Sequence, residues 1–191
     1  MNIEISINLA FEIIKKWESL IKLLKNGNVT AYLDPVGIPT IGWGTTQYLN
    51  GKVVKMGDII TQKQAYDEAI GETRKKAIAI QKLLIVEVTN EQMAAMISMA
   101  YNMGVSGMTS KNFFKKLNSE PNFNPVQISN IIKDTAVTAK GVFLRGLVNR
   151  RADEAKLFLT KSTEAEKKKS NPFRKAATDF YNYFGFFITG Q

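Results

Sequence analysis

The strongest constraint on the fold is an abrupt change of pattern near residue 28. Before it, residues 7–25 repeat apolar side chains at the spacing of one helix face: Leu9, Ala10, Ile13, Ile14, Trp17, Leu20, Ile21 and Leu24. After it, residues 29–60 hold five glycines, two prolines and short β-branched or aromatic runs. That composition is typical of a small antiparallel sheet with tight turns, and Asn50-Gly51 is a hairpin signal. The chain therefore joins a helix directly to a small β-lobe.

From residue 61 onward the pattern is helical. Thr61-Gln-Lys-Gln64 and Thr89-Asn-Glu-Gln92 both fit the capping box, which satisfies free backbone N–H groups at a helix start. The expected helices are 62–84, 90–103 (ending at Gly104), 110–117 (capped by Thr109), 125–133 (begun by Asn124-Pro125) and 143–160. The sequence thus predicts an α+β fold with a β-lobe at about 29–60. A helical lobe follows at about 62–160, and the N-terminal helix belongs to it. A long helix joins the two lobes, and a cleft lies between them.

Two missing residue types restrict the chemistry. The 191 residues include no cysteine and no histidine. This excludes disulfide scaffolds, thiolate zinc sites, cysteine nucleophiles and Ser-His-Asp catalysis. Acid–base catalysis must therefore use Asp, Glu, Lys or Tyr.

The net charge of +9 favours contact with polyanions such as nucleic acid, anionic lipid or an anionic cell wall, although it also serves solubility. Nucleic acid is the weakest of these partners, because no single helix carries a concentrated basic face. The N-terminus lacks a secretory signal, since Glu4 and Glu12 interrupt it, and no run of about 18 apolar residues follows. We therefore expect synthesis in a cytoplasm without an export signal.

Three polar side chains are candidates for catalysis. Asp34 and Thr40 flank a predicted turn in the segment YLDPVGIPTIGWGTT, where they can face the same side and hold one water. Asp34 can equally well close an Asx turn. Glu18 has Ile14 and Ile21 as helical neighbours, and a desolvated carboxyl there could act as a general acid. The alternative is a boundary Glu whose carboxylate lies in water.

The order of these motifs resembles the phage-type lysozymes, the muramidase family of the T-even phage lysozymes and lambdoid-phage endolysins. The resemblance runs through residues 7–160, with motifs at 17–20, 32–46, 51–58, 100–104 and 146–152. It implies an α+β lysozyme-like fold and hydrolysis of the β-1,4 bond between N-acetylmuramic acid and N-acetylglucosamine in peptidoglycan. The reaction implied by this resemblance requires neither a metal nor an organic cofactor. We expect the protein to be a monomer.

The resemblance also implies roles for individual residues. Glu18 corresponds to the general acid, and Asp34 and Thr40 correspond to the positions that hold a water on the opposite face of the sugar, as in an inverting mechanism. Thr46, Tyr101 and Ser110 would line the saccharide cleft. Tyr101 can also be read as core packing.

One departure from the family pattern concerns the spacing of the two acids. Glu18 and Asp34 lie 16 positions apart, about seven residues or two helical turns more than is usual in the family. The expected accommodation is a first helix extended from about Leu9 to Leu24, with Leu20, Ile21 and Leu24 buried. The helix would then stop at Asn26-Gly27-Asn28.

Residues 161–191 lie beyond the resemblance and form a basic, aromatic extension. Aromatic and alanine side chains share a helical face over 172–188, after the lysine run 167–169. This pattern fits either an interfacial helix that contacts an anionic membrane or lipopolysaccharide, or one more core helix.

Other functions remain open at this stage. A catalytically lapsed wall- or membrane-binding protein on the same fold would share the charge and the aromatic extension. A chitinase or a lytic transglycosylase would also fit the carboxylate chemistry. An active enzyme would reach the cell wall from the periplasm or from outside.

Overall fold

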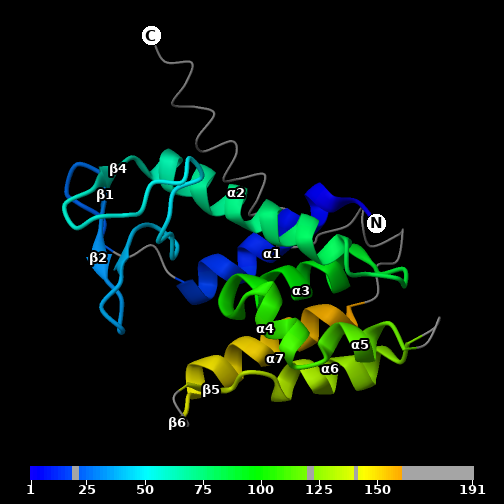
Figure 1. Ribbon diagram of the computed structural model, residues 1–191. Coiled ribbons are helices and arrows are strands. Elements are labelled where there is room, and N and C mark those ends of the chain that lie inside the picture. Colours follow the sequence, from blue (N-terminus) through cyan, green and yellow to red (C-terminus); the bar gives the residue numbers. More distant parts are fainter. Residues whose placement is uncertain (19–21, 120–122, 140–141, 161–191) are drawn as a thin grey trace.

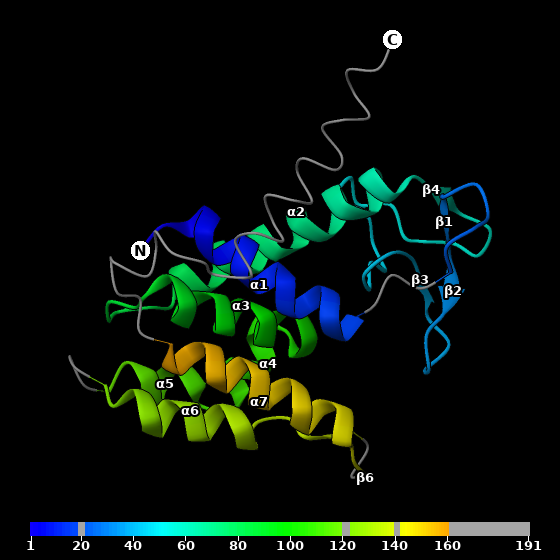
Figure 2. The ribbon, with the colours of Figure 1, turned by 180° about the vertical axis from the view of Figure 1, so that it is seen from behind.

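The computed structural model describes residues 1–18, 22–119, 123–139 and 142–160, and helices dominate them (Figures 1 and 2). The helices are α1 (Ile3–Glu18), α2 (Gln62–Gln81), α3 (Asn90–Met103), α4 (Val105–Ser110), α5 (Phe113–Leu117), α6 (Pro125–Asp134) and α7 (Arg145–Leu159). With the short antiparallel strands, they confirm the expected α+β class.

The strands form three antiparallel pairs in the described part of the chain. β1 (Val29–Thr30) pairs with β4 (Ile59–Ile60), β2 (Tyr32–Leu33) with β3 (Pro39–Thr40), and β5 (Thr138–Ala139) with β6 (Val142–Phe143). The first two pairs build the β-lobe, residues 22–60, which lies at one end of α2 (Figure 1). The third is a small hairpin before α7 that the sequence did not predict.

The core is centred on α3, where every residue from Gln92 to Ala100 is buried. α1, α2 and α7 all pack against this helix. The short alanine and the unbranched methionine side chains of α3 allow close packing on several sides. Phe11 of α1 extends the core toward the β-lobe, with its ring edge-to-face to Trp43 at 5.5 Å and to Tyr66 at 5.2 Å. The two lobes therefore share one apolar core.

The predicted starts of two helices are confirmed by their hydrogen bonds. Thr61 and Gln64 exchange backbone–side-chain bonds of 2.9 and 3.1 Å, and Thr89 and Gln92 form the same capping box. Pro125 stands at the first turn of α6, whose N-cap Asn124 accepts from the next turn. α3 ends at Met103 before Gly104, as predicted.

The predicted length of the first helix is wrong. α1 ends at Glu18, Lys22 has a left-handed backbone (φ 60°), and Leu23 forms an antiparallel bridge with Val29. Asn26 and Gly27 (φ 79°) lie in the turn of this hairpin rather than at a helix C-cap. Leu23 is exposed, and Leu24 is half-buried instead of buried. The extra residues thus enlarge the β-lobe; the predicted burial of residues 20 and 21 lies outside the described residues.

Two other expectations need comment. Thr109 does not cap a helix over 110–117, because it lies inside α4, and left-handed Asn112 (φ 56°) separates α4 from α5. The predicted helix over 172–188 lies outside the described residues. Within the described residues, no helix is both long enough and apolar enough to cross a bilayer.

Candidate active site

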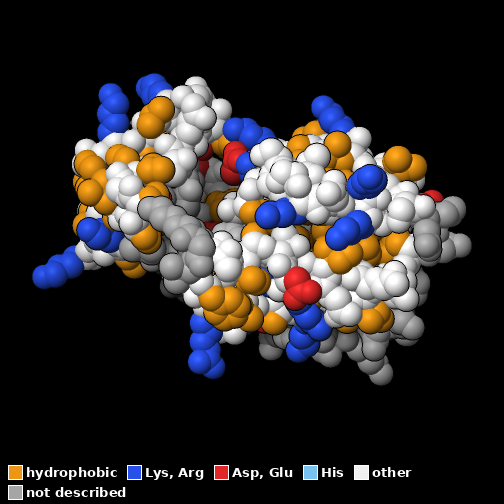
Figure 3. All heavy atoms as spheres, turned by 60° about the horizontal axis from the view of Figure 1, so that its bottom comes forward, with side chains coloured by type: hydrophobic (Ala, Val, Ile, Leu, Met, Phe, Trp, Pro, Cys, Tyr) orange, Lys and Arg blue, Asp and Glu red, His pale blue; other side chains and the backbone are white. Residues whose placement is uncertain are grey.

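Glu18 is the last residue of α1 and lies beside the β-lobe. Its carboxylate Oε1 accepts a hydrogen bond from Arg150 Nη1, and its side chain is 24% exposed. A Cβ placed on Gly44 would lie 3.5 Å from Glu18 Oε2, so the missing side chain of Gly44 leaves room beside that oxygen. The molecular surface is hollowed between the β-lobe and the helices (Figure 3). Two settings were open for Glu18: a purely apolar one is not found, because a guanidinium faces its carboxylate, and the side chain is only partly exposed to water.

Tyr101 of α3 lies on the helical side of Gly44, the same glycine that Glu18 approaches. Its Cε1 lies 3.8 Å from the Cβ position on Gly44, and its hydroxyl donates to the Trp43 carbonyl oxygen at 2.7 Å. Burial raises the pKa of Tyr101, and the charge of Glu18 raises it further. Of the cleft residues expected from the sequence, Tyr101 is therefore brought next to Glu18. Its hydroxyl bond also fixes the backbone of the Gly-Trp-Gly turn.

Asp34 and Thr40 occupy the hairpin of β2 and β3. Thr40 pairs with Tyr32, and the backbone N–H of Asp34 donates to the Ile38 carbonyl at 3.0 Å. Side chains alternate along a strand and match across a pair, so Tyr32, Asp34 and Thr40 share one face of the hairpin. The two expected site residues are therefore brought to the same side.

The Asx turn considered for Asp34 is also present. Asp34 Oδ1 accepts from the backbone N–H groups of Val36 at 2.9 Å and Ile38 at 2.8 Å. Both bonds use the same oxygen, so within the described chain Oδ2 keeps its capacity to accept. Thr40 is 3% exposed, and its hydroxyl donates to the Ile38 carbonyl at 3.0 Å. The lone pairs of the hydroxyl oxygen can still accept a hydrogen bond from a further donor. The turn thus orients the carboxylate rather than occupying it.

Tyr32 is a buried residue of β2, on the hairpin face that it shares with Asp34 and Thr40. Burial raises the pKa of its phenol, and the charges of Glu18 and Asp34 raise it further. The two acids, 16 positions apart in sequence, thus both affect the pKa of this phenol. Tyr32 was not predicted, because a tyrosine in a short strand gives no signal beyond strand propensity.

Thr46 and Ser110 are both exposed. The carbonyl of Thr46 accepts from the Val54 N–H at 2.9 Å, and the Ser110 hydroxyl donates to the Gly107 carbonyl at 2.9 Å. These bonds tie each residue to its own lobe. Among the described residues, no hydrogen bond connects either of them to Glu18.

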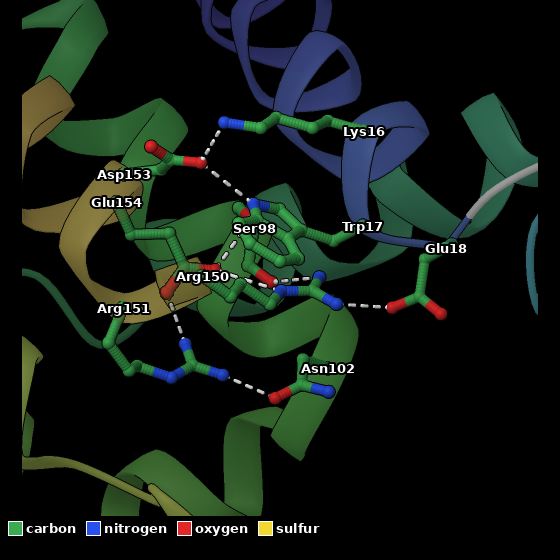
Figure 4. Close-up of polar contacts among 9 residues, drawn as sticks. All are labelled: Lys16, Trp17, Glu18, Ser98, Asn102, Arg150, Arg151, Asp153 and Glu154. Carbon is green, nitrogen blue, oxygen red and sulfur yellow. Dashed lines mark hydrogen bonds and ion pairs between the residues drawn. The ribbon is translucent and has the colours of Figure 1, made fainter. Parts of the chain in front are cut away.

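Arg150, the hydrogen-bond partner of Glu18, belongs to a buried ionic network (Figure 4). Arg150 also donates to Glu154 Oε1 at 3.2 Å and to the Ser98 carbonyl at 3.2 Å, and the Ser98 hydroxyl donates to Glu154 Oε1 at 2.7 Å. Arg151 binds the other oxygen of Glu154 and the side chain of Asn102. Burial raises the pKa of the Glu154 carboxyl, which the two guanidiniums oppose. The network fixes Arg150 so that it reaches Glu18, whose second oxygen points away from the network.

Sequence reasoning assigned no role to Arg150 or Glu154. The Arg-Arg-x-x-Glu order in a helical segment indicates ion pairs at i,i+3 and i,i+4, both of which form. The contact with Glu18 spans 132 positions and has no local signal. In the described residues, no group of three or more Asp, Glu, His or Cys side chains could hold a metal ion.

Comparisons with known proteins identify the family. A family model described as phage lysozyme matches residues 22–154, a range that includes Asp34, Thr40 and Arg150 and begins just after Glu18. The SAR-endolysin of Pseudomonas phage phiKMV is 32% identical over 142 residues, which are 74% of this chain and 84% of that protein. An endolysin of Acyrthosiphon pisum secondary endosymbiont phage 1 is 30% identical over 139 residues, covering 73% and 92%.

Solved structures agree as well. An endolysin from Escherichia coli O157:H7 phage FAHEc1 superposes with a TM-score of 0.66 and 35% identity, covering 79% of this chain and 90% of that one. A mutant of P22 lysozyme superposes with a TM-score of 0.63 and 26% identity, covering 79% and 95%. The family match spans more than half of the sequence, and the matches to the two endolysins span most of their length. This chain therefore belongs to the phage lysozyme family.

Proposed function

We propose that this phage lysozyme cleaves the β-1,4 bond between N-acetylmuramic acid and N-acetylglucosamine with inversion, using Glu18, Asp34 and Thr40. As a member of its family the protein is a glycosidase that hydrolyses peptidoglycan in bacterial cell lysis. Two observations support the residue assignment: Glu18 lies beside Gly44 and Tyr101, and Asp34 and Thr40 share one face of the β2–β3 hairpin.

Glu18 is suited to donate a proton to the glycosidic oxygen. Its Oε2 points away from the buried network toward the space that Gly44 leaves open. Proton transfer leaves a carboxylate, whose charge is balanced by Arg150 on Oε1. The guanidinium is itself held by Glu154 and the Ser98 carbonyl, so it need not reorient during the reaction.

Asp34 and Thr40 are suited to hold the attacking water. Asp34 Oδ2 can accept a hydrogen bond from one O–H of the water and take that proton as the water attacks. The Thr40 hydroxyl oxygen can accept a hydrogen bond from the other O–H, which remains on the new sugar hydroxyl, because the proton of Thr40 itself is directed to Ile38. Water held in this way attacks the sugar from the face opposite Glu18. In inverting glycosidases the two carboxyl groups stand about 6.5–9.5 Å apart to admit that water.

Glu18→Gln tests the acid assignment, and Glu12→Gln is its matched control. Both changes remove one carboxylate from α1, but Glu12 pairs with Lys15 at 2.8 Å, away from Arg150. Glu18→Gln should lower turnover of purified peptidoglycan by about 10²–10⁴-fold with the fold intact. Glu12→Gln should stay near wild type. Lysis by Glu18→Gln at the wild-type rate would refute the assignment.

Mass spectrometry of the digested wall distinguishes the related enzymes. A muramidase leaves a reducing N-acetylmuramic acid end, a lytic transglycosylase leaves an anhydro sugar, and a lapsed binding protein leaves intact strands. Asp34→Asn should be nearly as severe as Glu18→Gln, with Thr40→Ala milder. A transglycosylase would tolerate changes at Asp34 and Thr40, because it uses no hydrolytic water.

We further propose that Tyr101, Thr46 and Ser110 contact the saccharide chain. Tyr101 is supported by its position beside Glu18, and the other two by their exposure at the ends of the Gly-Trp-Gly turn and of α4. Substituting Thr46 or Ser110 by alanine should raise KM and leave kcat nearly unchanged.

We also propose that residues 1–160 form the catalytic domain of a monomer and that residues 161–191 contact an anionic membrane or lipopolysaccharide. The lysine run and the aromatic spacing of 161–191 support this role. A chain ending at Thr160 should digest purified walls normally but lose binding to anionic liposomes. A loss of several kcal/mol of stability would instead identify the extension as a core helix.

A further inference from the structure

The last turn of α1 carries Glu18 but lies outside the apolar core. The buried residues of this helix are Ser6, Ile7, Ala10, Phe11, Ile13 and Ile14. From Lys15 to Glu18 every residue is exposed or half-buried. Packing against α3 therefore fixes the helix up to Ile14, and the orientation of its final turn depends on polar contacts.

Three polar contacts connect this turn to two residues of α7, Arg150 and Asp153 (Figure 4). One is the ion pair between Glu18 and Arg150. The other two involve Asp153, one turn further along α7, whose Oδ2 accepts from the Trp17 indole Nε1–H at 3.0 Å. Lys16 Nζ lies 2.6 Å from the same Oδ2 and 5.2 Å from the Trp17 ring centroid.

The Glu18–Arg150 and Trp17–Asp153 contacts respond differently to the proton on Glu18. A general acid must hold its proton before the reaction, and a protonated carboxyl loses most of its attraction to a guanidinium. The Glu18–Arg150 contact is therefore weakest in the state that is ready to react. The Trp17–Asp153 bond does not involve the Glu18 carboxyl, so it keeps its strength in both protonation states.

We propose that the Trp17–Asp153 hydrogen bond is a positioning contact, which holds the end of α1 so that protonated Glu18 faces the glycosidic oxygen. This inference rests on the proposed role of Glu18 as the general acid. A bond from an N–H donor to a carboxylate is among the stronger hydrogen bonds in proteins. Lys16 is 61% exposed, and ion pairs of such exposure contribute little, so the indole bond makes the larger contribution.

The test is the turnover of soluble, uncrosslinked glycan strands by four variants of the full chain. Trp17→Phe and Asp153→Ala should each lower kcat about ten- to a hundredfold with KM nearly unchanged, because the acid is displaced while the saccharide contacts remain. Asp153→Asn should recover most of kcat, since its amide oxygen still accepts the indole N–H. Lys16→Ala, the matched control on the same carboxylate, should retain wild-type kcat.

The double variant Trp17→Phe/Asp153→Ala should fall no further than the more severe single variant, because both changes remove one bond. Fully additive losses, or wild-type kcat in Trp17→Phe, would overturn the inference, as would a loss in Asp153→Asn equal to that in Asp153→Ala. If Asp153→Ala fails to fold, Trp17→Phe and Asp153→Asn still decide the matter. Glu18→Gln in the same assay separates the two proposals, since its retained activity would refute the proposed function itself.

Discussion

Replacing Gly42 by alanine is expected to destabilise the fold by about 2–5 kcal/mol, more than the same change at Gly37. Gly42 is buried in the turn closed by reciprocal backbone bonds between Ile41 and Thr45, at 2.8 and 3.0 Å. Its φ is +62°, and a Cβ there would lie 3.0 Å from the Cβ of Ala65 in α2. The turn continues into Gly44, so its placement bears directly on the space beside Glu18.

The expected loss of stability in Gly42→Ala has two parts. A left-handed conformation costs a residue with a Cβ about 1–2 kcal/mol. Forcing an extra methyl against a well-packed neighbour costs about 1–3 kcal/mol more. Gly37 has φ +86° and no atom within 4 Å of its Cβ position, so Gly37→Ala incurs the first part alone. The difference between the two variants therefore measures how tightly the β-lobe packs on α2.

Chemical denaturation gives the unfolding free energies, and thermal unfolding gives an independent check. At about 2–4 °C per kcal/mol for a chain of this size, Gly42→Ala should lower the Tm by about 4–20 °C. Adding Ala65→Gly should restore the steric part, despite the helix cost of about 1 kcal/mol for that glycine. If Gly42→Ala and Gly37→Ala were equally stable, or Gly42→Ala cost as much in an Ala65→Gly background as in the wild type, the packing argument would be wrong.

Two further predictions concern the core and the alkaline limit of stability. Phe11→Ala should cost about 3–5 kcal/mol in urea denaturation, because its 2% exposed ring packs against both Trp43 and Tyr66; a cost below 1 kcal/mol would show that the lobes do not share this core. Burial, with the hydrogen bond to Asp58, raises the pKa of Tyr48 to about 12. The folded state keeps the phenol proton longer than the unfolded state, so this contribution is complete below about pH 10 and lost as pH rises to about 12. Unfolding free energies measured over that range should fall more steeply for wild type than for Tyr48→Phe, and parallel curves would contradict the assignment.

Local signals in the sequence were sufficient for most of the helices. The capping boxes and Gly104 act within a few residues, so the bounds of α3 followed from sequence alone. The end of α1 did not, because the apolar spacing continues past Glu18 and Asn26-Gly27 serves equally well as a helix C-cap or as a hairpin turn. Pairing of Leu23 with Val29 decides between these alternatives, and such pairing depends on the β-lobe as a whole.

In the candidate site, too, some residues could be predicted from local sequence signals and others could not. Asp34 and Thr40 stand close in sequence, and the register of one hairpin brings them together. Arg150 and Asp153 reach α1 across more than 130 positions, and only the packing of α7 beside α3 creates those contacts. Motifs therefore indicated the proposed reacting groups, while the residues that contact them from distant helices required the three-dimensional structure.

The contact between the first and the last described helices has a consequence for how the protein is made. Glu18 is polymerised 132 residues before Arg150, and Trp17 is polymerised 136 residues before Asp153. Until α7 is made, a nascent chain carries Glu18 without either contact. Premature termination anywhere before α7 yields a polypeptide that contains Glu18, Asp34 and Thr40 yet lacks the helix that contacts the end of α1. On the roles proposed for these residues, we expect lytic capacity only after α7 has been translated.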